Sequence, residues 1–215
     1  TSNVVMKCRY NGERLNILNQ WPIFMTMDFE QTDDGTVWVS TSSTDIFAFH
    51  PGNNEPERKQ VFNVDFTFIP SLLKINDGSM LISAFYQKIL KMDPKTGKLT
   101  LLDIPDMQQC IRRSVYIPTD MHQDTRGDVW IGTVSNGLLR YNPKTNTMTR
   151  IAGLSCSDVG SIEEDRQGNL WISTMKGLNR LDAKTGRITS LYKADGIGGD
   201  EFCDRASCQL PNGSL

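Results

Sequence analysis

The stretch QGNLWIST, residues 167–174, decides the fold because close copies of it recur along the whole chain. The copies read DDGTVWVST (33–41), DGSMLISA (77–84) and RGDVWIGT (126–133), and a fifth begins as PNGSL (211–215). Each copy holds one anchor glycine, and successive anchors are 43, 49, 41 and 45 residues apart: Gly35, Gly78, Gly127, Gly168 and Gly213. Periods of this length are typical of β-propeller blades.

Each copy extends into four short predicted strands. In the clearest copy these strands cover residues 160–165, 169–174, 177–182 and 187–192, which we call strands a, b, c and d. The turn between a and b places Asp165 first and Gly168 at its left-handed position. The turn between c and d recurs as DPKTG (93–97), NPKTN (142–146) and DAKTG (182–186). Pro suits the second position of such a turn, and Gly or Asn suits its end.

Strand b is apolar without alternation, as in Leu170-Trp171-Ile172. A strand covered on one face alternates, whereas a strand covered on both faces reads as a continuous apolar run. We therefore expect each blade to be packed between two neighbours. Strand b then continues with a small residue, which would let blades approach closely: Ser40, Ser83, Gly132 and Ser173. The recurring Trp38, Trp130 and Trp171 are interpreted as blade core and not as an aromatic binding ladder.

The predicted fold is all-β, a propeller of four-stranded antiparallel blades with about five blades present, two of them partial. The expected blades cover residues 1–20 (partial), 21–66, 67–113, 114–154, 155–194 and 203–215 (partial). Residues 4–9 and 13–18 are assigned to strands c and d of an earlier blade, and 205–210 to strand a of a later one. The two remnants together could close a ring of about five blades, since open edges favour aggregation. We favour a piece of a larger propeller.

Composition narrows the classes of partner. The net charge of −2 gives no electrostatic basis for binding nucleic acid or an anionic membrane surface. No apolar run approaches the ~20 residues that a membrane span needs. The five cysteines are expected to be unpaired, buried thiols, although Cys203 and Cys208 leave a local disulfide open. We expect no metal site and no cofactor.

No catalytic constellation is expected either. His50 falls in a c–d turn and His122 in a strand a, and both are interpreted as structural. Glu163 and Glu164 are adjacent carboxylates, and a glycosidase also uses a pair of carboxylates. Adjacent residues of a strand point to opposite faces, so these two should not converge on one substrate.

The repeat resembles the two-component-regulator propeller repeat, most closely at residues 124–141 and 165–181. The copy at 77–93 lacks the Trp, and the copy at 33–49 has Asp45-Ile46 in place of Gly-Leu. The resemblance implies the periplasmic sensor region of a Bacteroidetes-type hybrid two-component histidine kinase, itself anchored in the membrane elsewhere. It also implies a segment that is not an enzyme and that senses oligosaccharides. The alternatives are a protein-interaction scaffold and a lyase-type propeller enzyme.

The candidate ligand site lies on the d–a and b–c loops, which should share one face of a propeller and which commonly carry function. Aromatic rings stack on sugars, and Arg or Lys pairs with carboxylate or sulfate groups. These side chains could instead be solvated, with Trp21 and Tyr116 filling blade edges. Outer blades with exposed faces should also self-associate into a dimer or larger species. The predicted ligand-binding residues are Trp21, Tyr86, Lys88, Arg112, Arg113, Tyr116 and Lys176.

Overall fold

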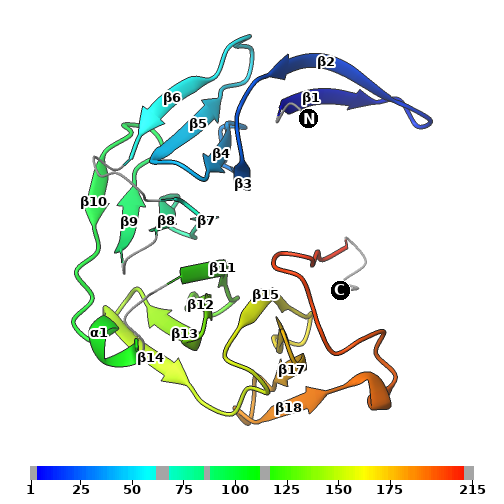
Figure 1. Ribbon diagram of the computed structural model, residues 1–215. Helices are drawn as coiled ribbons and strands as arrows, with labels where there is room; N and C mark the ends of the chain where they lie inside the picture. The colour runs from blue at the N-terminus through cyan, green and yellow to red at the C-terminus, as the bar shows by residue number, and fades with distance from the viewer. Residues whose placement is uncertain (1–3, 62–67, 85–87, 112–116, 211–215) are drawn as a thin grey trace.

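Antiparallel β-sheets build almost the whole molecule. The structure, a computed structural model, describes residues 4–61, 68–84, 88–111 and 117–210. Within these residues it contains 18 strands, one helical turn α1 (Met107–Cys110) and one 3-10 turn η1 (Lys193–Asp195). Four four-stranded sheets and a two-stranded ribbon stand side by side in an arc around a common centre (Figure 1). The predicted all-β propeller architecture is confirmed.

The sheets follow one another in sequence order. The ribbon pairs β1 (Val5–Tyr10) with β2 (Leu15–Trp21). The first sheet contains β3 (Thr26–Gln31), β4 (Val37–Thr41), β5 (Asp45–Phe49) and β6 (Glu57–Gln60). The second contains β7 (Ser71–Lys74), β8 (Met80–Ala84), β9 (Lys88–Met92) and β10 (Leu99–Leu101). The third contains β11 (Ile117–Gln123), β12 (Val129–Val134), β13 (Gly137–Asn142) and β14 (Thr147–Ile151), and the fourth β15 (Val159–Glu164), β16 (Leu170–Thr174), β17 (Gly177–Leu181) and β18 (Ile188–Leu191).

Within each four-stranded sheet, strand a lies nearest the centre and strand d at the rim (Figure 1). Consecutive inner strands β3, β7, β11 and β15 contact one another. Three of them carry a register shift against strand b, which leaves Met27, Thr119 and Gly160 without a partner residue. A bulge of this kind inserts one unpaired residue and bends the strand. The three bulges therefore free backbone groups next to the axis.

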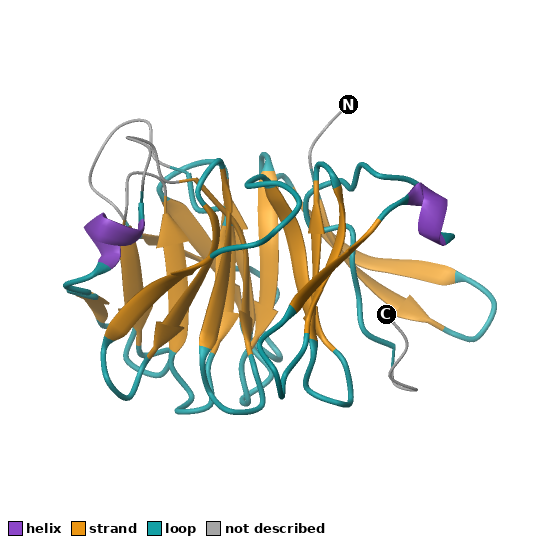
Figure 2. Cartoon of the chain, turned by 90° about the horizontal axis from the view of Figure 1, so that it is seen from below, coloured by secondary structure: helices purple, strands orange, loops and turns teal. Residues whose placement is uncertain are grey.

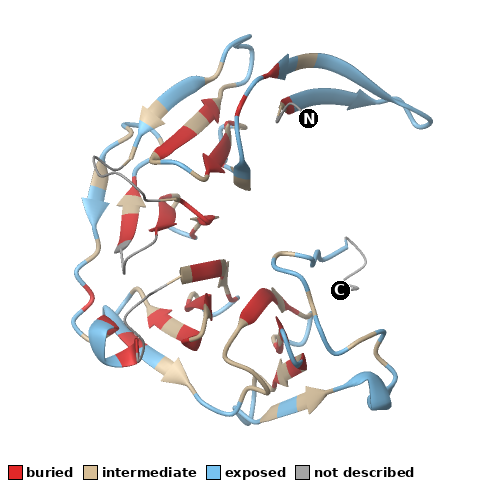
Figure 3. Ribbon diagram, viewed as in Figure 1, coloured by how far each residue is buried: buried red, intermediate tan, exposed pale blue. Residues whose placement is uncertain are grey.

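The core lies between neighbouring sheets, and strand b supplies it from both of its faces. Trp38 of the first sheet packs against Met80 and Ile82 of the second. Trp130 of the third sheet packs in the same way against the strand b of the fourth. In the first three copies the middle residue of the apolar triplet therefore contacts the following sheet, and in the later copies the flanking residues contact the preceding one. This arrangement explains the absence of alternation, because both faces of strand b are buried (Figure 3).

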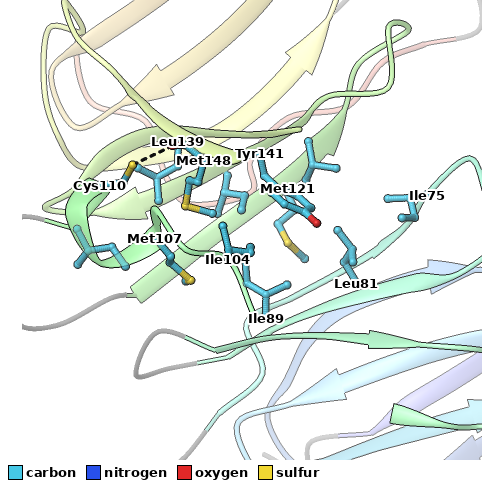
Figure 4. Packing of buried hydrophobic residues seen from close by; sticks show 13 residues of the cluster. Ile75, Leu81, Ile89, Ile104, Met107, Cys110, Met121, Leu139, Tyr141 and Met148 are labelled. Atoms are coloured by element: carbon cyan, nitrogen blue, oxygen red, sulfur yellow. Dashed lines mark hydrogen bonds between the residues drawn. The ribbon is translucent and has the colours of Figure 1, made fainter. Parts of the chain in front are cut away.

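Figure 4 shows the core between the second and third sheets, where sulfur-containing and aliphatic side chains meet. Leu81 takes the place of the tryptophan in this copy and is 1 % exposed. The turn α1 adds Met107 and Cys110, and the Cys110 thiol donates to the Met148 carbonyl at 3.4 Å. The second copy thus fills its interface with Met and Leu, which adapt to an irregular space.

The small residue that follows the apolar triplet of strand b permits the close approach that the sequence predicts. A Cβ atom on Gly132 would lie 2.6 Å from Val159 Cγ1 of the next sheet and 3.0 Å from Thr119 Oγ1. Contacts this short do not occur between real carbon atoms, so the third and fourth sheets could not keep this spacing with a larger residue.

Three expectations need correction or refinement. All five cysteines are free, but only Cys110 is buried, and Cys8, Cys203 and Cys208 are exposed. The reason is their position: Cys8 lies in β1, where every residue after Val5 is exposed, and the other two lie in the segment after the last sheet. Residues 205–210 run alongside β15 but, contrary to the prediction, form no strand there. A strand a is stabilised by its strand b, and the residues that would supply it, 211–215, lie outside the described residues.

Trp171 is also less buried than expected, being only half-buried. No complete sheet follows the fourth one in the described chain. The ring of Trp171 instead borders a cavity of about 530 Å³ that the segment 202–208 partly covers.

Candidate functional site

The d–a and b–c loops do share one face of the sheets, as the alternation of antiparallel strands requires (Figure 2). In the first sheet, Ser42 N donates to the Met25 carbonyl at 2.9 Å. Asp158 connects two sheets on this face. Its Oδ1 accepts from Ser135 N at 2.6 Å, and its carbonyl accepts from Met175 N at 3.1 Å. We call this surface the loop face.

Two of the predicted ligand-binding side chains are described. Trp21 ends β2 and is 7 % exposed. Its Nε1 donates to the Asn54 carbonyl at 3.0 Å, and its ring meets Phe49 edge-on at 4.7 Å between centroids. Lys176 is exposed in the turn between β16 and β17. Trp21 and Lys176 belong to opposite ends of the arc, so the structure does not bring them together.

The other predicted positions remain predictions. Lys88 begins β9 at the loop-face end of the second sheet, and its side chain is not described. The remaining four lie outside the described residues: Tyr86, Arg112, Arg113 and Tyr116.

A small cavity that the sequence does not indicate also opens by the loop face. It has a volume of about 260 Å³, and its walls come from the loop 152–157 together with Gly137 and Arg150. Arg150 Nε donates to the Asn136 carbonyl at 2.7 Å, which fixes the guanidinium at the cavity wall. A guanidinium in this position suits an anionic or hydroxyl-rich group.

A second cluster, which we call the axial cluster, lies at the centre of the arc around Arg205. The backbone N–H of Arg205 donates to the Gly160 carbonyl at 3.1 Å. Its Nε donates to the Thr119 carbonyl at 2.7 Å, and its Nη1 donates to the Met27 carbonyl. Nη1 also lies 3.9 Å from Asp28 Oδ1. Arg205 therefore contacts three sheets, the fourth through its backbone N–H and the first and third through its side chain, across as many as 178 residues of sequence.

Sequence reasoning missed this cluster, although a signal was present. Arg205 lies eight residues before the anchor Gly213, and its three carbonyl partners lie eight residues before their own anchors. The repeat therefore brings equivalent positions to one level of the axis.

Two carboxylates complete the axial cluster. Asp28 Oδ2 accepts from Leu72 N, and Asp120 Oδ2 accepts from Ile162 N, each at 2.8 Å and each from the following sheet. Burial raises the pKa of Asp120 to about 6, against the lowering effects of the Ile162 hydrogen bond and of the Arg205 charge. Burial also raises the pKa of Asp28. The cluster is thus rich in oxygen acceptors and suited to a cation.

The acidic residues of β15 diverge, as predicted. Glu163 Oε1 accepts from Ser207 Oγ at 2.9 Å. Glu164 accepts instead from Thr125 N and Thr125 Oγ1 of the preceding sheet, at 2.9 and 2.8 Å. His122 Nε2 lies 3.8 Å from Glu164 Oε2, but both carboxylate oxygens are already used to hold the Thr125 turn. Within the described part of the chain, no group of three or more residues is placed to hold a metal ion.

Comparison with known proteins agrees with the repeat. Residues 153–176 match the family model described as two component regulator propeller. A search of curated proteins found no match. No helix in the described residues has the length and apolarity to cross a membrane.

Solved structures share the fold. The extracellular domain of BT3049 from B. thetaiotaomicron, a proposed hybrid two component system, is 16 % identical with a TM-score of 0.75, over 96 % of this chain and 28 % of its own. That of BT4673 from the same organism, a proposed one component system, is 17 % identical with a TM-score of 0.74, over 95 % and 27 %. Virginiamycin B lyase from Staphylococcus aureus is 13 % identical with a TM-score of 0.69, over 86 % and 62 %. The chain spans little more than a quarter of the length of the two extracellular domains.

Proposed function

We propose that this chain is part of the ligand-sensing propeller of a hybrid two-component sensor histidine kinase, that it lies in the periplasm, and that it responds to oligosaccharides. The observation that carries the proposal is the two-component-regulator repeat at residues 153–176, set in a propeller arc similar to extracellular domains of two-component systems. The kinase activity would belong to other parts of the parent protein.

The loop face supports a carbohydrate ligand by its chemistry. It presents the exposed ammonium of Lys176 and the cavity beside Arg150. Its remaining predicted ligand groups are two tyrosines and further basic residues. Hydroxyl, carboxylate and sulfate groups of polysaccharide fragments are acceptors for such donors, and aromatic rings can stack on their apolar faces.

A signalling assay in the full-length sensor tests this proposal. Replacing Arg112 and Arg113 together with Ala should abolish the response to an active oligosaccharide, because both side chains would contact the ligand. A matched control is Lys184→Ala, which removes an exposed lysine from a c–d turn, on the rim away from the loop face. Normal signalling by the Arg112/Arg113 variant would exclude this loop as the ligand site.

The two alternatives give different results in parallel assays. A scaffold should retain a specific protein partner in a pull-down and bind no glycan fragment. A lyase should deplete its substrate, as expected of a relative in fold of virginiamycin B lyase. In that case His122→Ala should stop turnover. Under the sensor proposal no turnover is expected from the parent or from this variant, and the variant changes stability alone. The reason is that Glu164, the neighbour of His122, holds the Thr125 turn by a hydrogen bond.

A further inference from the structure

We propose that the axis of the propeller is a binding site for a guanidinium group, that the chain fills it with its own Arg205, and that an external guanidinium ligand can compete for it and release the segment 202–210. This inference does not depend on the proposed sensing of oligosaccharides.

The acceptors of the site are provided by the repeat. Met27, Thr119 and Gly160 are the unpaired residues of the three bulges, so they stand outside the regular register of strands a and b. All three accept hydrogen bonds from Arg205, from its backbone N–H at Gly160 and from its side chain at the other two. The guanidinium itself uses the Thr119 and Met27 carbonyls, so its site is made by two separate sheets at one repeat position and does not depend on a single loop.

Charge favours a cation at this point. The carboxylates of Asp28 and Asp120 flank the guanidinium, and both interact electrostatically with Arg205. A guanidinium offers five N–H donors in a rigid fork, and it suits several oxygen acceptors better than the compact ammonium of lysine does. The arrangement of acceptors therefore favours a guanidinium over an ammonium group of the same charge.

The fit of Arg205 itself is incomplete. Its Nη2 is buried and has no hydrogen-bond partner among the described residues. A buried donor without a partner lowers stability. Arg205 also has a φ of +55°, a left-handed conformation that is unfavourable for a residue with a Cβ. The strained backbone at Arg205 is therefore a cost that the chain bears and that a free guanidinium ligand would not bear.

The surroundings of the axial cluster allow an external ligand to replace the Arg205 side chain. Arg205 borders the cavity of about 530 Å³ that also contacts Trp171 and Phe202, which gives a small ligand a route to the axis. Apart from Arg205, the segment is held to β15 by Ser207 Oγ on Glu163 and by Gln209 Nε2 on the Glu164 carbonyl. Loss of the axial contacts should leave residues 205–210 held by these two side-chain hydrogen bonds and therefore loosen this segment, while the four sheets stay in place.

Chemical rescue tests the site. Arg205→Ala should lower the melting temperature by about 4 °C or more, because the side-chain contacts with the first and third sheets are lost. Methylguanidinium at millimolar concentration should restore part of this loss, since a ligand that binds only the folded state stabilises it. Methylammonium and urea at the same concentration should not. Arg187→Ala, which removes an exposed arginine outside the cluster, should melt like the parent and show no response.

The carboxylates provide a further check. Adding Asp28→Asn to Arg205→Ala should reduce the rescue, because the neighbouring charge is removed. A melting temperature unchanged by Arg205→Ala, or a destabilised variant that methylguanidinium does not restore, would overturn the proposal.

Hydrogen exchange of the unmodified chain keeps the test independent of variant folding. Methylguanidinium should accelerate exchange at the Arg205 amide, which is bonded to the Gly160 carbonyl, and leave the amides of β16 unchanged. Unchanged exchange at Arg205 under saturating methylguanidinium would exclude competition for the axis.

Discussion

Trp130 Nε1 donates a 2.9 Å hydrogen bond to Asp124 Oδ2, a carboxylate with no exposed side-chain surface. The same carboxylate accepts from two backbone N–H groups of the a–b turn, those of Arg126 and Asp128. The bond therefore links the turn to the core residue that packs against the next sheet. The fourth sheet repeats it with Asp165 and Trp171. The first sheet has Thr32 at the Asp position, and there Trp38 Nε1 is buried with no hydrogen-bond partner among the described residues.

The tryptophan hydrogen bond can be isolated by a matched pair of variants. Trp38→Phe and Trp130→Phe remove similar volumes from rings that are 4 % and 2 % exposed. Only the second also removes a hydrogen bond to a buried carboxylate, so it should cost about 1.5–3 kcal/mol more. Urea unfolding monitored by circular dichroism measures the difference. Equal losses for both variants would show that the Asp124 bond contributes nothing to stability.

Removing the whole ring should have different effects on stability in the two sheets that carry this hydrogen bond. Trp130→Ala should lower the free energy of unfolding by about 3–5 kcal/mol, as expected for a large core side chain. Trp171→Ala should cost less, since Trp171 is half-buried beside a cavity. Melting temperatures of both variants give the order. If the Ala variant at position 130 melts within a degree of the parent, this ring is not core.

Asp120 should make stability depend on pH in an unusual direction. Its folded-state pKa of about 6 lies above the ordinary value of 3.8, so the folded chain holds a proton that the unfolded chain releases between these pH values. Its contribution to stability is therefore present at low pH and is lost as the pH rises to about 6. Asp120→Asn, which keeps an oxygen acceptor for Ile162 N, should remove this contribution.

Other carboxylates act in the opposite direction, so the test is the difference between Asp120→Asn and the parent. The pKa of Asp165 is lowered by hydrogen bonds from Asn169 and Trp171, which outweigh its burial, and it stabilises the fold as the pH rises. The gain of the Asn variant over the parent should increase between pH 4 and pH 7. A constant difference across this range would mean that Asp120 titrates normally.

Exposed apolar side chains on the two-stranded ribbon should drive self-association of the chain. Tyr10, Leu15 and Ile17 are 65, 70 and 60 % exposed, and adjacent apolar groups of this size favour burial. We expect a dimer or larger species by light scattering, and a shift to monomer in Leu15→Gln with Ile17→Gln. Leu101→Gln, at an exposed rim position of β10, is the matched control and should not change the mass. A monomeric parent at high concentration would contradict this prediction.

The sequence predicted the features that repeat. Anchor glycines and the apolar triplets specified four strands per blade, because turn chemistry and two-sided burial act locally. The sequence pattern did not reveal the role of Arg205, since its partners at Met27 and Thr119 meet it only when three sheets converge. The sequence pattern also did not predict the exposure of Cys203 or the half-burial of Trp171, because both depend on what covers the outer face of the last sheet.

Equilibrium titration of the purified chain with oligosaccharide fragments tests the sensing proposal most directly. We predict saturable binding of at least one oligosaccharide, weakened by Lys176→Ala and unaffected by Lys184→Ala, because the first lies on the loop face and the second on the opposite rim. Failure of the correctly folded chain to bind any fragment, or equal effects of the two lysine variants on the affinity, would contradict a carbohydrate site on this face.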